Sequence, residues 1–257
     1  MIAVTFALPA ESSEFLRLLG NRSRVHRNGI SIVRGTIGDR SIEVIHTGVG
    51  ANVCRQRIGK FLLNQQFDFL ISAGFAGSLN HDLQVNDLLV AKNFSTIDLK
   101  QAHLLFSPLV IHPIDLLTVR AVIDSSEERE RIARKSGASA VDMETEFIAR
   151  ACAVHGIPLL ALRVITDTPT QPFPAPPSVL FDIQQQRTHI TALAKFFLLN
   201  PSRLANLIRF ASRIAGARTT LANVLVKIVP NLHPKPATTP PFGDGGSRLA
   251  APIKSTR

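Results

Sequence analysis

The sequence predicts an α/β protein, with a single domain built on a twisted, mostly parallel (mixed) central sheet that is flanked by helices. Short apolar stretches of strand length alternate with helix-like stretches through residues 1–167, as in parallel sheets covered on both faces. Glycines follow two of the apolar stretches, where ligands bind in open sheets of this class. Hydrophobic residues make up 45% of the 257 residues, enough for a sizeable core.

The N-terminal part predicts one strand within residues 2–8 and two within 30–48, which turn at Gly38-Asp39. A helix is expected after Gly50, because apolar residues recur there at helical spacing, at Cys54, Ile58, Phe61 and Leu62. Residues 67–74, "FDFLISAG", predict a strand buried on both faces, and residues 86–91 predict another.

A helix is predicted within residues 125–138, with Ser126 as the N-cap, acids in the first turn and Gly137 as the stop. A second helix runs from Met143 to His155 and leads into a buried strand at 159–166. Residues 168–178, "TPTQPFPAPPS", hold five prolines and predict a loop, which is a candidate lid over a site.

Three further helices are predicted near residues 179–198, 201–217 and 219–229, followed by a disordered tail rich in Pro, Gly and Thr. We therefore divide the chain into an α/β domain of residues 1–200, a basic amphipathic helical appendage of 201–229 and a disordered basic tail of 230–257. In the appendage, one apolar stripe is formed by Leu204, Ile208, Ala211 and Ile214.

The positive charge is concentrated at the C-terminal end. Residues 201–257 contribute +8 of the net charge of +10, so residues 1–200 are nearly neutral. A basic amphipathic helix is a candidate for binding an anionic membrane surface. Nucleic acid is a weaker candidate, because Phe242 is the one aromatic residue of the tail. A solvated tail without a partner, or ordinary packing of the helix, is the alternative.

The compartment is predicted to be reducing. Cys54 and Cys152 lie far apart and form no CxxC motif, so neither a disulfide framework nor structural zinc is expected. The N-terminus lacks the basic region of a signal peptide, and no apolar stretch reaches the roughly 18 residues of a membrane span. We expect a cytoplasmic protein without a metal, peripheral to the inner membrane face if the basic region binds lipid.

Two glycine-rich segments are candidate ligand sites. "HTGVGANVCRQ" places Gly48 and Gly50 between a strand and a helix, but Val53 stands where a dinucleotide fingerprint has its third glycine. A tight turn that requires a positive φ is an equally good explanation. "ISAGFAGSL" again has glycines directly after a buried strand, so the two turns could line one crevice.

Acidic residues mark two further candidates. "LLALRVITD" carries Arg163, Thr166 and Asp167 at or near the end of a buried strand. Partial burial raises the pKa of such an Asp, which suits a general acid, whereas an N-cap or turn role before a proline is the alternative. "AVDMETEF", residues 140–147, places three carboxylates around Met143, where a solvated helix face is the simpler explanation.

Five segments of the chain, taken in order, resemble the nucleoside phosphorylase/nucleosidase superfamily. They are "LPAESSEF", "HTGVGANVCRQ", "ISAGFAGSL", "VNDLLVA" and "AVDMETEFIARACAVHGIPLLALRVITD". This superfamily includes methylthioadenosine/S-adenosylhomocysteine nucleosidase. The branch that the chain resembles most is hopanoid-associated nucleoside phosphorylase, which has a similarly short middle region. The resemblance spans roughly residues 1–170.

The resemblance implies a role for several residues. Glu144 matches the acid that accepts the ribose hydroxyls, and Met143 the residue that packs on the sugar. Asp167 matches the general acid that protonates purine N7, Arg163 a residue near the ribose and the nucleophile, and Glu11 the base of hydrolytic members. The other substrate-binding candidates are Gly48, Gly50, Gly74, Ala76, Gly77 and Thr166. Asp142 and Glu146 are expected to be dipole partners at the helix start or solvated.

The chain also departs from the family pattern. Phe75 replaces a small hydroxyl residue that orients the general acid, for which Thr166 is a candidate substitute. The segment between Asp87 and Met143 is shorter and lacks a recognisable base-stacking strand, so base specificity is open. The N-terminal phosphate loop of hexameric phosphorylases is absent, so both water and phosphate are considered as the nucleophile.

The expected function is cleavage of the N-glycosidic bond of a purine nucleoside or an adenosyl-bearing metabolite, including a lipid-linked adenosyl group. We expect a homo-oligomer that acts on a small molecule and needs no cofactor, with phosphate as co-substrate if the reaction is phosphorolysis. The alternative is a catalytically inactive nucleoside-binding protein of the same fold.

Overall fold

The computed structural model describes residues 1–97, 106–123, 125–175, 179, 181–182, 187–188, 196–200 and 204–232. The strands of its main sheet are β1 (Ile2–Phe6), β2 (Gly20–Arg27), β3 (Ile30–Ile37), β4 (Arg40–His46), β5 (Phe69–Ser78), β6 (Leu88–Ala91), β7 (His112–Ile114), β8 (Leu116–Thr118), β9 (Ala140–Asp142) and β10 (Leu159–Asp167). The longer helices are α1 (Pro9–Leu18), α2 (Ala51–Leu62), α4 (Ser126–Ser136), α5 (Thr145–Val154) and α8 (Leu204–Ile228).

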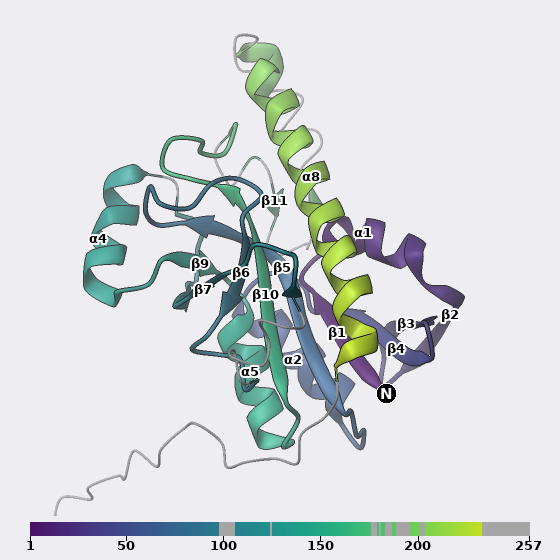
Figure 1. Ribbon diagram of the computed structural model, residues 1–257. Coiled ribbons are helices and arrows are strands. Elements are labelled where there is room, and N and C mark those ends of the chain that lie inside the picture. Colours follow the sequence, from purple (N-terminus) through teal and green to yellow (C-terminus); the bar gives the residue numbers. More distant parts are fainter. Residues whose placement is uncertain are drawn as a thin grey trace, which may run out of the picture.

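One mixed sheet forms the centre of the molecule (Figure 1). Its strand order is β2-β3-β4-β1-β5-β10-β6-β7, and β9 joins β5 to β8. The four central strands, β4, β1, β5 and β10, are parallel. The pairs β2–β3, β3–β4 and β6–β10 are antiparallel, whereas β6 pairs parallel with β7. The predicted α/β class with a mixed, mostly parallel sheet is confirmed.

Helices cover both faces of this sheet (Figure 1). On one face, α1 and α8 pack over β1, β5 and β10, with Phe6, Phe15 and Leu225 in one buried cluster. On the other face, α2 and α5 enclose a second cluster that includes Phe61 and Ile148. Because both faces are covered, the central strands are mostly apolar, which explains the long apolar runs in the sequence.

The register of β5 and β10 fixes the part of the sheet that matters for function. Arg163 of β10 lies opposite Gly74 of β5, and Asp167 lies opposite Gly77. β5 continues to Ser78, so the glycines of "ISAGFAGSL" lie within a strand and the predicted turn after it is wrong. The missing side chain of Gly77 leaves space for Asp167 against the backbone, whereas a Cβ on Gly74 would lie in ordinary contact with Glu11.

The C-terminal part differs from its prediction. One continuous helix, α8, replaces the separate helices expected at 201–217 and 219–229. Its first half is mostly exposed and projects beyond the body of the molecule (Figure 1), whereas its second half is buried in the core. A short 3-10 turn, η2 (Val229–Asn231), and the buried Leu232 follow it. The tail beyond Leu232 lies outside the described residues.

Other local predictions are also corrected. Most of the helix predicted at 179–198 lies outside the described residues, but its described part contains an antiparallel pair, β11 (Phe181–Asp182) and β12 (Arg187–Thr188). The N-cap of α4 is Ser125, whose hydroxyl accepts the N–H of Glu128 at 3.1 Å, and not Ser126. Strand β2 was not predicted, because it is polar and mostly exposed.

Candidate active site

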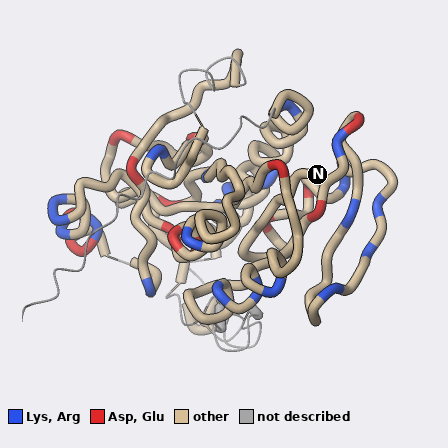
Figure 2. Tube along the Cα trace, turned by 90° about the horizontal axis from the view of Figure 1, so that it is seen from below, with Lys and Arg blue, Asp and Glu red and all other residues tan. Residues whose placement is uncertain are grey.

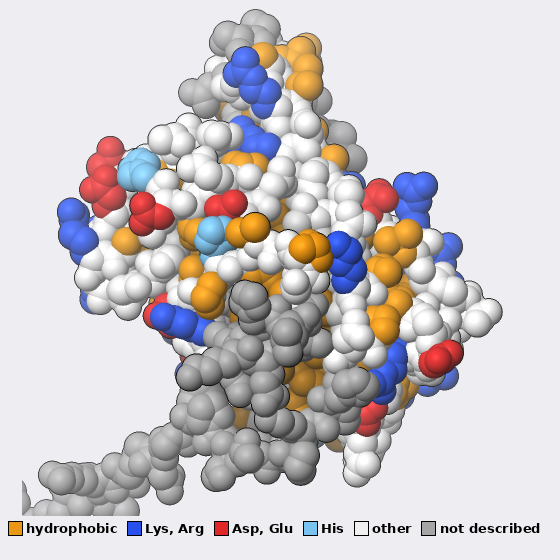
Figure 3. Space-filling model, viewed as in Figure 1, with side chains coloured by type: hydrophobic (Ala, Val, Ile, Leu, Met, Phe, Trp, Pro, Cys, Tyr) orange, Lys and Arg blue, Asp and Glu red, His pale blue; other side chains and the backbone are white. Residues whose placement is uncertain are grey.

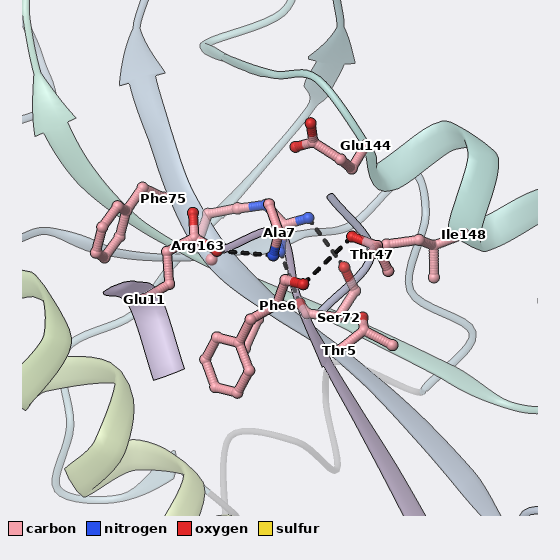
Figure 4. A pocket seen from close by; sticks show the side chains of 12 residues that line it. Thr5, Phe6, Ala7, Glu11, Thr47, Ser72, Phe75, Glu144, Ile148 and Arg163 are labelled. Atoms are coloured by element: carbon pink, nitrogen blue, oxygen red, sulfur yellow. Dashed lines mark hydrogen bonds between the residues drawn. The ribbon is translucent and has the colours of Figure 1, made fainter. Parts of the chain in front are cut away.

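A small polar pocket lies at the carboxyl ends of β1 and β4, against the middle of β5 and β10 (Figure 4). It is therefore where the first two strands of the parallel core give way to helices α1 and α2, as expected for ligand sites in open α/β sheets. Its lining residues are Thr5, Phe6, Ala7, Glu11, Thr47, Ser72, Ala73, Gly74, Phe75, Glu144, Ile148 and Arg163.

Glu11 enters the pocket from the first turn of α1. Its Oε2 accepts the backbone N–H groups of Ala7 at 2.8 Å and Leu8 at 3.2 Å, because a Glu at the third helical position can reach back to the N-cap. Burial raises the pKa of Glu11 from 4.5 to about 7, although the backbone N–H groups and Arg163 oppose the rise. A carboxyl with this pKa can accept a proton from water near neutral pH.

Glu144 enters the same pocket from the start of α5. Its Oε1 accepts the N–H of Gly50 at 2.9 Å, so the first glycine segment does touch a site residue. Gly50 has a φ of 89°, which L side chains rarely adopt, so both a turn role and a site role apply to it. Burial, followed by the nearby Asp142, raises the pKa of Glu144 to about 8.

Arg163 joins three segments beneath the pocket. Its Nη1 donates to the carbonyl oxygens of Ser72 at 2.7 Å and Leu162 at 2.6 Å. Its Nη2 donates to Ser72 Oγ at 2.9 Å, to Asp142 Oδ2 at 2.9 Å and to Thr145 Oγ1, and its Nε donates to Asp142 Oδ2 at 3.1 Å. Every N–H group of this guanidinium is thus engaged within the protein.

Asp142 is the counterion of Arg163, and sequence reasoning missed this. The carboxylate is buried, so a solvated Asp142 is wrong. It does accept the N–H of Thr145 at 3.0 Å in the first turn of α5, as a dipole partner would. Glu146 instead pairs with Arg150 on the outer side of the helix. Of the three carboxylates in "AVDMETEF", Asp142 and Glu144 are therefore buried and only Glu146 faces outward.

Asp167 lies beyond the pocket lining, at the end of β10. It is 3% exposed, and its Oδ1 accepts the hydroxyl of Thr166 at 3.0 Å. Its Oδ2 forms an ion pair at 2.5 Å with Arg129 of α4, a residue that sequence reasoning did not select. Burial raises the pKa of Asp167, and the guanidinium of Arg129 acts against that rise.

The remaining candidates are divided between the pocket and its surroundings. Phe75 lines the pocket, whereas Met143, Gly48 and Ala76 are not among the lining residues. Met143 is half-buried directly before Glu144, and Ala76 belongs to an apolar cluster on another part of the sheet. A Cβ on Gly77 would lie 2.7 Å from Asp167 Oδ2, so this glycine makes room for the carboxylate.

Thr5 adds a polar group that the sequence did not reveal. Its side-chain oxygen is buried in the pocket wall and has no hydrogen-bond partner among the described residues. Such an atom needs a partner, and a small polar molecule in the pocket would supply one. An apolar first strand offered a weak signal, since Thr5 is its one polar residue.

The described residues contain neither a metal-binding cluster nor a membrane-spanning helix. Within the described ranges, no group of three or more His, Cys, Asp or Glu side chains is placed to hold a metal ion. In the same part of the chain, no helix has both the length and the apolar character that crossing a bilayer requires.

The family model described as the phosphorylase superfamily matches residues 1–115 and 102–199. A 5'-methylthioadenosine/S-adenosylhomocysteine nucleosidase of Staphylococcus aureus is 24% identical over 198 residues, covering 65% of this chain and 86% of the relative.

Solved structures share the fold over most of the chain. The native futalosine hydrolase of Helicobacter pylori superimposes with a TM-score of 0.66 at 20% identity, covering 90% of this chain and 97% of that one. The 5'-methylthioadenosine/S-adenosylhomocysteine nucleosidase of the same organism, with butyl-thio-DADMe-Immucillin-A, gives a TM-score of 0.66 at 18% identity, covering 90% and 98%. The expected family is confirmed: the chain belongs to the phosphorylase superfamily.

Proposed function

We propose that the protein cleaves the N-glycosidic bond of a purine nucleoside or an adenosyl-bearing metabolite. The observation that carries this proposal is the pairing of two buried carboxyls with raised pKa values, Glu11 and Glu144, in one pocket above Arg163. The names of the relatives support it, since they describe nucleosidases for 5'-methylthioadenosine and S-adenosylhomocysteine and a futalosine hydrolase.

The chemistry divides among three carboxyls. Breaking the glycosidic bond creates positive charge on the ribose and negative charge on the departing base. Glu144 accepts the ribose hydroxyls, with Met143 against the sugar, and its ionised form, which predominates above the raised pKa of about 8, stabilises the cationic ribose. Glu11 takes a proton from the nucleophile, and Asp167 gives one to the base, with Thr166 orienting it in place of the hydroxyl that Phe75 displaces.

Water is the nucleophile that the pocket favours. All N–H groups of Arg163 are already engaged, so this guanidinium has no free donor for a phosphate. Glu11 and the unpartnered hydroxyl of Thr5 instead suit a water molecule, which donates to the carboxylate of Glu11 and forms a hydrogen bond with the hydroxyl of Thr5. We therefore expect hydrolysis without a cofactor, and phosphate as co-substrate only if phosphorolysis is found.

The test is incubation with adenosine, methylthioadenosine and inosine, each with and without phosphate, followed by chromatography of the free base. Base released without phosphate is expected. Release that requires phosphate would replace hydrolysis by phosphorolysis. Binding without any release would favour the alternative, a catalytically inactive nucleoside-binding protein. The Arg129–Asp167 ion pair and Phe75 are the observations that support this alternative.

We further propose that the projecting end of α8 contacts an anionic membrane surface. Leu204 and Ile208 are 49% and 65% exposed there, and Figure 3 shows apolar and basic side chains together at this end. Other Lys and Arg residues are spread over the whole trace (Figure 2). A lipid-linked adenosyl substrate, as the hopanoid-associated resemblance implies, would give this contact a purpose at the inner face of a cytoplasmic membrane.

Sedimentation with anionic and neutral liposomes tests this contact. Because the second half of α8 is in the core, substitutions at its exposed end are better than truncation. Ile208→Ser combined with Arg209→Glu is expected to abolish binding to anionic liposomes, whereas Arg134→Glu on α4 leaves it unchanged. Equal binding to neutral liposomes would contradict the proposal. We also propose a homo-oligomer, which light scattering of the purified protein would detect.

A further inference from the structure

Arg129 is the one buried residue of α4, although this helix is rich in charged residues and mostly exposed. Its side chain is 1% exposed and reaches across to the end of β10. Nη1 donates to the carbonyl oxygen of Ser78 at 2.6 Å, and Nη2 donates to the carbonyl oxygen of Ile123 at 3.0 Å and to Asp167. Arg129 is thus fully buried and ion-paired with Asp167, the expected general acid, and this pairing requires an explanation.

The contact favours the ionised carboxylate. A guanidinium has only donors, so Asp167 Oδ2 acts as an acceptor while Arg129 holds it, and the positive charge stabilises the unprotonated form. The other oxygen, Oδ1, accepts the hydroxyl of Thr166. Both oxygens are thus occupied and the carboxylate is 3% exposed, so a base nitrogen can reach it only if one contact opens.

We propose that Arg129 is a positioning residue, which holds Asp167 unprotonated in the empty site and has to withdraw before Asp167 can protonate a leaving base. This inference rests on the proposed function. When Arg129 leaves, Asp167 takes a proton from solvent. As the glycosidic C–N bond breaks, its electron pair goes to the base, the proton of Asp167 moves to a base nitrogen, and Asp167 returns to the carboxylate. Water adds to the ribose carbon, and its proton goes to Glu11.

The attachment of α4 suits such a movement. Beyond Arg129, the helix touches the body through partly buried Ile132 and Ala133, and the hydroxyl of Ser126 donates to the carbonyl oxygen of Pro169 at 3.2 Å. In Figure 1 the helix lies at the outer edge of the molecule. Since Ser126 links the helix to the proline-rich loop after Asp167, a ligand that displaces this loop would also pull on α4.

Two cations act on Asp167 in the described part of the chain, Arg129 from α4 and Arg213 from α8. Arg213 does not touch the carboxylate; it donates to the carbonyl oxygen of Gln171 at 2.9 Å. A cation in hydrogen-bond contact lowers the pKa of an Asp by about 1–3 units relative to the same site without it. Arg129→Met keeps most of the side-chain volume and removes this effect.

The first test is the pH profile of kcat/KM for base release. If Asp167 has to be protonated, the ratio of the Arg129→Met value to the wild-type value should rise about tenfold or more between pH 5 and pH 8. A purely structural role would change kcat/KM by one factor at every pH, and that result would overturn the proposal. Arg134→Met, an exposed position on the same helix, should give a flat ratio, and Arg129→Lys should stay close to wild type because it keeps the cation.

The second test needs no activity and uses the unliganded wild-type protein. The ¹³Cγ signal of Asp167, identified by its loss in Asp167→Asn, should have the chemical shift of an ionised carboxylate at pH 7. In Arg129→Met, its titration should move upward by about 1–3 pH units. A wild-type Asp167 that is already protonated at pH 7 would overturn the inference even if the enzyme is active. Failure of every nucleoside assay would refute the proposed function alone.

Discussion

Glu11→Gln should stabilise the fold at alkaline pH while it removes the expected base. Glu11 has a pKa raised from 4.5 to about 7 by burial, so ionising it in the folded protein costs about 3 kcal/mol. Because the folded-state pKa is the higher one, this cost is absent below about pH 4.5 and complete above about pH 7. Gln has the same shape and can accept the N–H groups of Ala7 and Leu8 through its one oxygen.

The measurement is thermal unfolding of both proteins at pH 5 and pH 8. At pH 8 the variant should melt about 6–12 °C higher than wild type, since 1 kcal/mol shifts Tm by about 2–4 °C in a domain of this size. At pH 5, where only about 0.8 kcal/mol of this cost is present, the two Tm values should differ by only about 2–3 °C. Glu14→Gln, on the exposed side of the same helix, is the matched control. A Tm difference of equal size at both pH values, or a less stable variant at pH 8, would refute the reasoning.

Three other substitutions test the site itself. Asp167→Asn should lower turnover by about 10²-fold or more while nucleoside binding survives, and near-full activity would show that it is not the acid. Glu144→Gln should weaken cleavage of ribosides far more than of 2′-deoxyribosides, whereas equal losses would indicate a structural role at the start of α5. Gly77→Ala should impair activity because its Cβ would crowd Asp167, whereas Gly59→Ala on α2, with nothing within 4 Å, should stabilise the fold by about 0.5–1 kcal/mol.

Much of the fold was predictable because both faces of the sheet are covered. Apolar runs of strand length marked β1, β5 and β10, and helical spacing marked α2. β2 gave no such signal, because an edge strand needs no apolar run. It is held partly by the ion pair between Arg27 and the buried Glu43 of β4, at 2.7 Å, which no local pattern reveals.

The site was less predictable, because it depends on which side chains meet across the sheet. Glu11, Glu144 and Arg163 were found in one pocket, but Asp142 and Arg129 were missed as counterions of Arg163 and Asp167. In a helix rich in both signs of charge, "SEERERIARKS", one arginine looks like the others. The available signal was its spacing, since positions 129, 132 and 133 share one face of the helix.

The position of α8 also determines when the protein can fold. The apolar face of β1 and α1 is covered by the second half of this helix, which is made some 200 residues later. At about 5–20 residues per second, a ribosome needs about 10–40 s to add them. During that time the first strand and helix carry an open apolar surface on the nascent chain. A chaperone or the unfinished sheet has to shield that surface, and loss of α8 would leave it uncovered permanently.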